Sequence, residues 1–598
     1  GDNTFGVESA AEKFFAKRTA DLNLEESAVI VGMLKASHSY NPRLFPERAL
    51  ARRNTVLAQM ERYGYLMSEE RKIAAQSPIE LNYKSFSRDK GPAPYFRAHL
   101  QKELTKWLEQ YNQEHQTDYN LYTSGLKVHT TLNYELQSIA EEAYKAHLSE
   151  LQLAFEKSYG ERAPWLTDAE IIQSALNRSP YYQKLRSQNL SEEQIQDSLN
   201  KVHAVELWDW QGTQVVEASH LDSVRHYLKF LHGGILSLDP YTGAVKTWVG
   251  GIDFEHFQFD HVAMAKRQVG STFKPIVYAA ALENGVAPCD YYSGQQVTYT
   301  NYNDWTATNS GGESYDVNYA TKTALAQSIN TVAVKVMEDA GLSEVVELAH
   351  EMGIESDIPY VPSISLGTAE LKMIELAKAY TAFLNDSRPS QPYLIKSIEN
   401  AKGKVLAEFG PQIQEEPVFS SQTRQLMLEM MKGTVEEGTA QRLKWKYGLS
   451  NDIAGKTGTT QNNKDGWFVA LTPRLLTLTW VGSDDHRIGF KTTAMGQGAN
   501  SALPIFALFQ QKMNARQSLR KYSQAKFPPP PIKILNMMGC APEKEEGFLK
   551  KVFVNTDKPK ETTFEVDSLN HGKKKEGLFK KIGNLFKRKK KKNKNDQK

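Results

Sequence analysis

Two groups of β-rich segments, far apart in the chain, place the strongest constraint on the fold. The first, GGILSLDPYTGAVKTWVGG, spans residues 233–251 and turns at Pro240 and Gly243, where proline fixes φ and glycine permits a positive φ. The second group, NDIAGKTGTT, GWFVALTP and TLTWVGSDD, lies between residues 451 and 485. Helical patterns fill the interval, from Ser271 to about Asn284 and from Ala320 to Ala340. Strands from both ends that enclose helices predict one α+β domain.

A chain of 598 residues is too long for a single hydrophobic core, so we expect a multidomain protein. Apolar stripes in LNLEESAVIVGMLKAS and ERALARRNTVLAQMERYG predict a mainly α-helical unit at the N-terminus. SGLKVHTTL alternates like a strand, whereas residues 150–225 are polar and favour helices. The predicted division is a helical unit over 1–65, an interdomain linker region with a helical insertion over 66–225, the α+β domain over 226–515, and a proline-containing connector with a basic tail over 516–598.

The net charge of +3 conceals a strongly basic C-terminal tail. Residues 571–598 hold 13 Lys and Arg against 2 Asp and Glu, so the tail carries +11 and the remaining chain 3 − 11 = −8. Its apolar residues gather on one helical face: Leu578, Phe579, Ile582, Leu585 and Phe586. Two interpretations stay open, a solvated, unfolded charge run or a helix that lies on anionic lipid.

Three short motifs bear side chains that suit acyl transfer. Ser271-Thr272-Phe273-Lys274 opens a helical pattern, where residues three apart share a face. Ser328-Ile329-Asn330 falls inside the predicted helix ALAQSINTVAVKV, and Lys456-Thr457-Gly458-Thr459 lies on a predicted strand. Each motif alone has an ordinary structural explanation: a capped helix start, polar residues within a helix, or an edge strand with a solvated lysine.

The order of the motifs is far more specific than any one of them. They stand 57 (328 − 271) and 128 (456 − 328) positions apart, in the order found in penicillin-binding proteins and serine β-lactamases. The words RQVGSTFKPIVYAAALENG, GKTGTTQNNKDGWFVALTP and TWVGSDD closely resemble the transpeptidase domain of class A, bifunctional penicillin-binding proteins. The β-rich segment at 233–251 and SISLGTAELKMIELAKAYTAFLN extend the resemblance over essentially all of 226–515. The resemblance implies a penicillin-binding, serine β-lactamase-like α+β domain with an antiparallel sheet.

The N-terminal segment resembles a second domain of the same family. GVESAAEKFFAK, LNLEESAVIVGML and SYNPRLFPERALARRNTVL look like the last part of a family-51 peptidoglycan glycosyltransferase, which is mainly α-helical and lysozyme-like. The catalytic glutamates of that family lie in motifs upstream of this stretch, and Glu8 and Glu25 occupy positions that it does not use for chemistry. We therefore expect an N-terminally truncated chain whose bifunctional parent polymerises glycan, while this chain does not.

The resemblance also implies a role for each motif residue. Ser271 is the expected nucleophile and Lys274 its base, which must be neutral to act. Lys456 is expected to lower the pKa of Lys274, Asn330 to orient Lys274 and hold the substrate amide, and Ser328 to relay a proton. The expected substrate-binding residues are Thr457, Gly458 and Thr459, and the expected oxyanion donors are the backbone N–H groups of Ser271 and Thr459.

The expected function is a D,D-transpeptidase that crosslinks peptidoglycan stem peptides ending in D-Ala-D-Ala and is acylated by β-lactams. Two alternatives remain: a D-Ala-D-Ala carboxypeptidase or β-lactamase-type hydrolase, and a non-catalytic β-lactam receptor or scaffold. Ile329, where β-lactamases carry Asp, favours the penicillin-binding side. Lipid II-derived glycan is an expected partner of the parent, the tail is expected to touch anionic membrane, and nucleic acid is not expected. The expected location is the bacterial envelope, on the periplasmic, extracytoplasmic side of the plasma membrane.

The sequence predicts no cofactor and no metal. It contains neither H-E-x-x-H nor a phosphate-binding glycine loop. Two cysteines, Cys289 and Cys540, are too few for a disulfide framework or a zinc cluster. Whether these two cysteines pair with each other stays open at this point.

Overall fold

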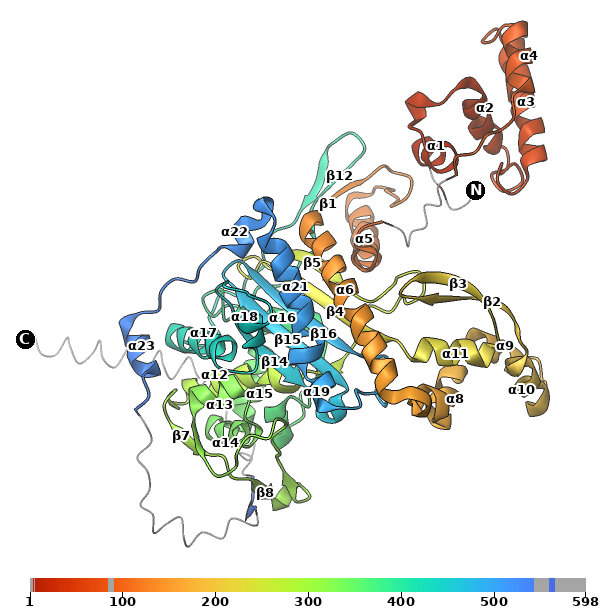
Figure 1. The fold of residues 1–598 in the computed structure, drawn as a ribbon. Coiled ribbons are helices and arrows are strands. Elements are labelled where there is room, and N and C mark those ends of the chain that lie inside the picture. The colour runs from red at the N-terminus through yellow and green to blue at the C-terminus, as the bar shows by residue number, and fades with distance from the viewer. Residues whose placement is uncertain (1–3, 5, 84–90, 542–558, 565–598) are drawn as a thin grey trace, which may run out of the picture.

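The computed structural model describes residues 4, 6–83, 91–541 and 559–564 of a multidomain α+β protein (Figure 1). The amphipathic basic tail predicted over 571–598 lies outside the described residues. Within the described part of the chain, none of the helices combines the length and the apolar character that a membrane crossing requires.

The N-terminal unit consists of four helices, α1 Val7–Phe15, α2 Leu24–Met33, α3 Pro46–Arg62 and α4 Ser68–Gln76. A capping box between Asn23 and Glu26 starts α2. The buried guanidinium of Arg53 donates to the carbonyls of Ala75 and Ser77, which ties the end of α4 to α3. Helix α4 falls in the polar stretch that was predicted to be linker, and it forms because Ala74 packs into the small core of this unit.

A five-stranded antiparallel sheet forms the centre of the protein, as the sequence predicted (Figure 1). Its order is β14 Ala454–Thr459, β15 Asp465–Thr472, β16 Leu475–Ser483, β4 Leu231–Leu238 and β5 Val245–Val249. Side chains on both faces are buried: Leu236 and Leu238 belong to one hydrophobic cluster and Ile235 to another. Because both faces are covered, every residue of β4, β15 and β16 is buried, with no alternation between buried and exposed positions.

Helices cover the two faces of this sheet. On one face lie α6 Tyr134–Tyr159 and α21 Leu503–Asn514, which run side by side across the strands (Figure 1). On the other face lie α12 Lys274–Glu283, α14 Asn330–Ala340, α16 Met373–Thr381 and α17 Ser421–Glu436. The three motifs therefore belong to this second layer and to the adjacent edge strand, β14.

The segment between the N-terminal unit and the sheet contains more strand than the sequence predicted. After α5 Pro94–His115, β1 Lys127–Thr130 pairs with β12 Ile395–Glu399, which pairs with β13 Val405–Glu408; β1 confirms the predicted strand SGLKVHTTL. The prediction that 150–225 is helical is wrong for residues 203–218. These form a hairpin with a two-residue turn at Trp210 and Gln211, and Gly212, which begins β3 with φ of +122°, pairs with Asp209. The elements from residue 164 to 228 are α7 Pro164–Thr167, α8 Ala169–Arg178, α9 Pro180–Ser187, α10 Glu192–Asn200, β2 His203–Asp209, β3 Gly212–Ala218 and α11 His220–Leu228.

After the sheet, the chain returns to the helical layer. Beyond Pro528–Pro531 it forms α23 Ile532–Met538, and Cys540 is disulfide-bonded to Cys289. Strand β17 Lys560–Thr562 pairs in parallel with β8 Val297–Tyr299, and Phe564 packs on Tyr299. The remaining helices and strands are β6 Arg267–Gln268, β7 Tyr291–Ser293, β9 Trp305–Thr306, β10 Asn318–Ala320, α13 Thr321–Gln327, α15 Leu342–Glu351, β11 Glu370–Leu371, α18 Arg442–Trp445, α19 Thr493–Gly496, α20 Gly498–Ser501 and α22 Arg520–Ser523.

Candidate active site

Ser271 lies in a 3₁₀ turn, Gly270–Phe273, that leads directly into α12. Two glycines with positive φ hold this turn: Gly270 donates its N–H to the carbonyl of Gly367 at 3.0 Å. A Cβ at Gly367 would lie 1.8 Å from the Gly270 carbonyl oxygen, so no other residue fits there without movement. The Tyr380 hydroxyl donates to the carbonyl of Thr272 at 2.6 Å. The nucleophile turn is thus fixed by contacts to segments about 100 residues away.

Lys274 is fully buried one 3₁₀ turn after Ser271, so the two side chains project from the same side of the turn. Its Nζ donates to Asn330 Oδ1 and to the Ser328 carbonyl, both at 2.7 Å, and lies 3.3 Å from Ser328 Oγ. Burial lowers the pKa of Lys274 well below its ordinary value, and the charge of Lys456 lowers it further. Both effects favour the neutral amine that a general base requires.

The second motif lies at a break between two helices and not inside one. The prediction of a continuous helix from Ala320 to Ala340 is wrong here, because Ser328 ends α13 in the left-handed region with φ of +61° and Asn330 begins α14. Asn309 makes the break possible, because its Oδ1 accepts from the N–H groups of Asn330 and Thr331 at 2.9 and 3.2 Å. The break directs both the carbonyl and the hydroxyl of Ser328 toward the amine of Lys274.

Lys456 projects from edge strand β14 into the same site. Its Nζ donates to Ser328 Oγ at 2.8 Å and to the Thr457 carbonyl at 3.0 Å. The side chain is fully buried, and burial lowers its pKa to about 7. The interpretation of a solvated lysine on an edge strand is therefore wrong. The Ser328 hydroxyl stands between the two lysine amines, in position to pass a proton between them.

The other three residues of the third motif have different surroundings: Thr457 and Gly458 pack inside the domain, and Thr459 lines the cleft. A Cβ at Gly458 would lie 2.8 Å from the Val269 carbonyl oxygen, so this glycine allows β14 to approach the nucleophile turn. Thr459 lines the cleft, and its Oγ1 accepts from the N–H of Gly498 at 3.0 Å. Thr457 is buried, and its hydroxyl bonds to that of Thr439 at 2.6 Å. Of the two threonines, only Thr459 lines the cleft.

Ser271, Asn330 and Thr459 open onto one cleft of about 610 Å³. Its other lining residues are mostly polar and come from loops: Gln268, Gly270, Trp305, Thr308, Asn309, Ser310, Ser363, Leu366, Gly367, Thr368, Thr460, Gln461, Asn462, Asn463 and Thr493. The sequence did not single out Asn309, Trp305 or Thr308, although Thr308 accepts from Asn330 Nδ2 at 2.7 Å. Gly367 lies in SISLGTAEL, which contributed to the resemblance without an assigned role.

Comparison with known protein families assigns three parts of the chain. The profile described as penicillin binding protein transpeptidase domain matches residues 233–483. A penicillin-binding protein middle domain profile matches residues 160–231, and a transglycosylase profile matches residues 1–61. The three matches follow one another along the chain without overlap. The motif residues Ser271, Ser328 and Lys456 fall within the transpeptidase match.

Curated relatives match most of the chain. Penicillin-binding protein 1A of Aquifex aeolicus is 30% identical over 548 residues, which cover 90% of this chain and 71% of that protein. Penicillin-binding protein 1A of Neisseria meningitidis is 28% identical over 545 residues, which cover 85% of this chain and 66% of that protein.

Solved structures show the same fold. The crystal structure of penicillin-binding protein 1A from Haemophilus influenzae superposes with a TM-score of 0.63 at 23% identity and covers 86% of this chain and 84% of that one. PonA1 from Mycobacterium tuberculosis in complex with penicillin V gives a TM-score of 0.50 at 22% identity, over 74% of this chain and 97% of that one. The Aquifex relative and the matched domains place the chain in the class A penicillin-binding proteins, peptidoglycan-synthesising enzymes of the cell envelope with a transglycosylase and a transpeptidase domain.

Proposed function

We propose that this chain is a serine-type D,D-transpeptidase that crosslinks stem peptides ending in D-Ala-D-Ala through an acyl-enzyme on Ser271. The observation that carries the proposal is the convergence of two fully buried lysines on the hydroxyl of Ser328, beside the cleft that Ser271 lines. Buried lysines are costly to keep charged, so a pair of them next to a serine is an arrangement suited to proton transfer.

In the acylation step, the neutral amine of Lys274 takes the proton from Ser271 Oγ. The Oγ then bonds to the carbonyl carbon of the penultimate D-Ala, and the oxyanion accepts from the backbone N–H groups of Ser271 and Thr459. A Cβ at Gly270 would lie 2.7 Å from the Thr459 carbonyl oxygen and 3.1 Å from its nitrogen, so these two backbones already lie close together. An oxyanion donor of this kind contributes roughly 3–4 kcal/mol to other acyl-transfer enzymes.

Collapse of the tetrahedral intermediate breaks the bond to the terminal D-Ala. Its departing nitrogen takes a proton from Ser328 Oγ, and Lys274, 3.3 Å away, then gives Ser328 Oγ the proton that it took from Ser271. The C-terminal carboxylate of the substrate is attracted by the charge of Lys456 and held by Thr459, which lines the cleft. Thr457 and Gly458, which were predicted to bind substrate, support this strand from behind through the contact with Thr439 and the close approach to Val269. An acceptor amine then attacks the acyl-enzyme and forms the crosslink, and Ser271 regains its proton.

A hydrolase and a non-catalytic receptor or scaffold are the competing functions, and the domain composition does not favour them. The middle-domain and transglycosylase matches belong to chains that build peptidoglycan. We further propose β-lactams as acylating ligands, lipid II-derived glycan as a substrate of the complete bifunctional enzyme, and a position on the extracytoplasmic side of the membrane. Contact of the 571–598 tail with anionic membrane and the domain division at residues 65, 225 and 515 stay proposals.

Labelling with a fluorescent penicillin tests the nucleophile. We expect a covalent band with the full chain and with Ser421→Ala, a control at an exposed serine on α17, and no band with Ser271→Ala. Labelling that survives Ser271→Ala overturns the assignment. Mass analysis of products from a D-Ala-D-Ala peptide with an added acceptor amine then separates the functions: crosslinked product supports transpeptidation, and hydrolysed product alone supports the hydrolase.

A further inference from the structure

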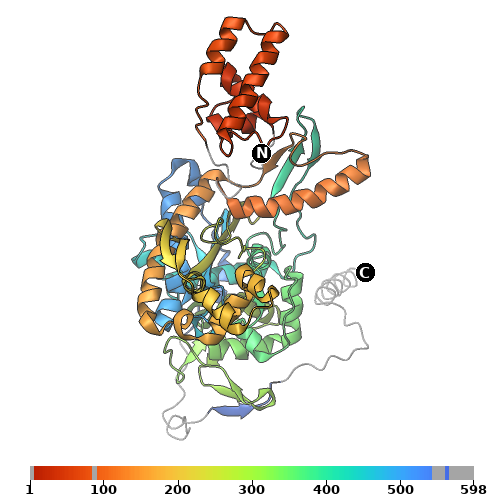
Figure 2. The ribbon, with the colours of Figure 1, turned by 90° about the vertical axis from the view of Figure 1, so that its right-hand side faces the viewer.

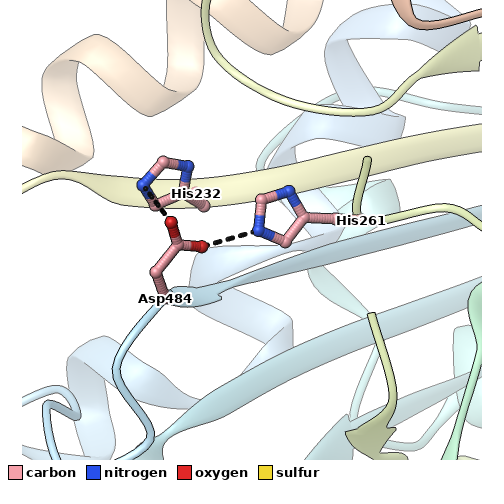
Figure 3. Close-up of side chains that lie close together, drawn as sticks. All are labelled: His232, His261 and Asp484. Carbon is pink, nitrogen blue, oxygen red and sulfur yellow. Dashed lines mark hydrogen bonds and ion pairs between the residues drawn. The ribbon is translucent and has the colours of Figure 1, made fainter. Parts of the chain in front are cut away.

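Two histidines and an aspartate meet at the end of the central sheet (Figure 3). His232 lies on β4, His261 on the segment between β5 and β6, and Asp484 directly follows β16. One nitrogen of each imidazole faces a different carboxylate oxygen: His261 Nε2 lies 2.8 Å from Oδ1 and His232 Nε2 lies 3.3 Å from Oδ2. All three ligand atoms lie within 4.8 Å of one another.

The contact between His261 and Asp484 requires a proton or a metal ion between the two side chains. Its Nδ1 lies 2.9 Å from the Gly250 carbonyl oxygen, which only accepts, so Nδ1 must carry a proton. In the neutral ring, Nε2 then presents a lone pair to the carboxylate, and two acceptors at 2.8 Å repel each other. Either a second proton or a metal ion must lie between them. A histidine whose other nitrogen donates to a backbone carbonyl is the usual arrangement of a metal ligand.

His232 is likewise buried beside Asp484, and its ring is 2% exposed. Its Nδ1 is buried and has no hydrogen-bond partner among the described residues, and its Nε2 faces Asp484 Oδ2. The rings of His232 and His261 stack with their centroids 5.2 Å apart. The ring of His261 also stacks on that of Trp480, with a centroid distance of 5.0 Å. This packing holds both rings in place, as a preformed metal site requires.

The surroundings leave room and charge for a cation. Asp484 is 51% exposed, and His232 and Asp484 both line a cavity of about 990 Å³. Arg267 lines the same cavity, and its charge reaches His232 and Asp484. Its guanidinium is held by the Ser483 carbonyl at 2.6 Å, lies 3.9 Å from the Asp465 carboxylate and packs over Trp480. No residue lines both this cavity and the cleft of Ser271.

We propose that His232, His261 and Asp484 bind a zinc ion, whose remaining coordination position faces the cavity. Two imidazoles and one carboxylate are a donor set that Zn²⁺ accepts, and three protein ligands leave a fourth position for water or another small ligand. Ca²⁺ and Mg²⁺ prefer sites made of oxygen atoms and are not expected to bind. The ligands come from three segments more than 200 residues apart at their extremes, so the sequence showed no metal motif.

Zinc titration of the chelator-treated 598-residue chain tests the proposal. We expect one Zn²⁺ per chain, a higher unfolding temperature with Zn²⁺ but not with Ca²⁺, and visible absorption bands when Co²⁺ replaces Zn²⁺. His261→Gln and Asp484→Asn should each weaken binding by at least ~10-fold. His256→Gln is the matched control, because His256 lines the same cavity and pairs with Asp253 at 2.7 Å but is not one of the three ligands.

The outcomes separate a metal site from an ion pair. Asp484→Asn changes a half-exposed side chain outside the cleft, so it should retain penicillin labelling, which shows that the variant is folded. Loss of zinc binding in a variant that still labels, with binding retained in His256→Gln, supports the proposal. Absence of stoichiometric binding in the unsubstituted chain, or equal binding in Asp484→Asn, overturns it and leaves a protonated His261 paired with Asp484.

Discussion

At the scale of single residues, the candidate site depends on two lysines with different surroundings. Lys274 has three acceptor contacts from the second motif, whereas Lys456 shares the Ser328 hydroxyl and a backbone carbonyl. Burial disfavours the charged form of both lysines, and the charge of Lys456 further disfavours that of Lys274. The proposed mechanism needs opposite states: Lys274 neutral as the base, and Lys456 charged to attract a carboxylate.

These opposite requirements predict a pH optimum for acylation. Burial lowers the pKa of Lys456 to about 7. A lysine is charged below its pKa, so its attraction for the penicillin carboxylate is present at lower pH and is lost as the pH rises through about 7. Lys274 must lose its proton, so the rate rises with pH on the acid side. We expect a bell-shaped second-order rate of penicillin acylation, which reports the free enzyme, with its descending limb near pH 7.

Lys456→Arg is the matched variant for this prediction. Arginine keeps its charge over the whole range, so the descending limb should disappear while the ascending limb remains. Stopped-flow acylation from about pH 5 to about pH 9 measures both limbs. If the unsubstituted chain shows no fall above pH 7, or if the arginine variant shows the same fall, Lys456 does not act through its charge.

At the scale of elements, the site is assembled by turns and helix breaks and not by helix spacing alone. The nucleophile turn touches the loop at Gly367 and strand β14, and the second motif owes its shape to a cap from Asn309, 21 residues earlier. These contacts place the backbone of Gly270, which precedes Ser271, beside that of Thr459. The elements themselves are ordinary; the close approaches between them require glycine at a few positions.

Gly367→Ala should impair acylation much more than its backbone strain alone predicts. Gly367 and Gly403 share a φ of +78°, but a Cβ at 367 would lie 1.8 Å from the Gly270 carbonyl oxygen, whereas one at 403 has no heavy atom within 4 Å. Gly403→Ala should therefore cost only the strain, about 1 kcal/mol of stability. Displacement of the nucleophile turn in Gly367→Ala should slow acylation on the order of 100-fold. Equal acylation rates in the two variants would contradict this account of the turn.

The disulfide between Cys289 and Cys540 should stabilise the packing of α23 on the transpeptidase domain, but catalysis should not depend on it. It closes a loop with a sequence separation of 251, and chain entropy gives about 5 kcal/mol as the upper range for such loops. Lys322 also donates to the Met538 carbonyl at 2.7 Å, so α23 keeps other anchors after reduction. We expect dithiothreitol to lower the unfolding temperature and to speed proteolysis within 532–541 while penicillin labelling persists. A Cys289→Ser/Cys540→Ser variant should show the same behaviour without reductant, and no difference on reduction would refute the prediction.

The elements also show what the sequence was able to predict. Strands β4, β5, β14, β15 and β16 were predictable because apolar runs and turn residues are local signals, and the three motifs were found by their order. The break at Ser328 was not, because ALAQSINTVAVKV is helical by local preference and its cap comes from Asn309. The pairing of Cys289 with Cys540, and the approach of His232, His261 and Asp484, depend on tertiary packing that no local pattern reports.

At the scale of the whole molecule, the helices α1–α4 and the sheet domain have separate interiors. The hydrophobic clusters of the N-terminal unit draw their members from residues 10–83. The two large clusters around the sheet begin at Ala93 and take in the helices on both faces. Figure 2 shows the same division, with α1–α4 as a unit of its own. The middle segment has a further small cluster, centred on α8, α9 and α10.

Separate interiors predict separate unfolding. The N-terminal clusters contain only a few fully buried apolar side chains, such as Phe14 and Leu57, whereas those around the sheet contain many. Stability increases with the apolar surface that is buried, so calorimetry of the full chain should show a small transition at lower temperature and a larger one above it.

A chain that begins at Pro92 should lose the first transition, keep the second, and label with penicillin at a rate within about 2-fold of the full chain. The loss of labelling on heating should follow the second transition, because the nucleophile turn, α12 and β14, which hold the site residues, pack into that interior. A single transition that moves to lower temperature when residues 1–91 are removed would instead show that the two units stabilise each other.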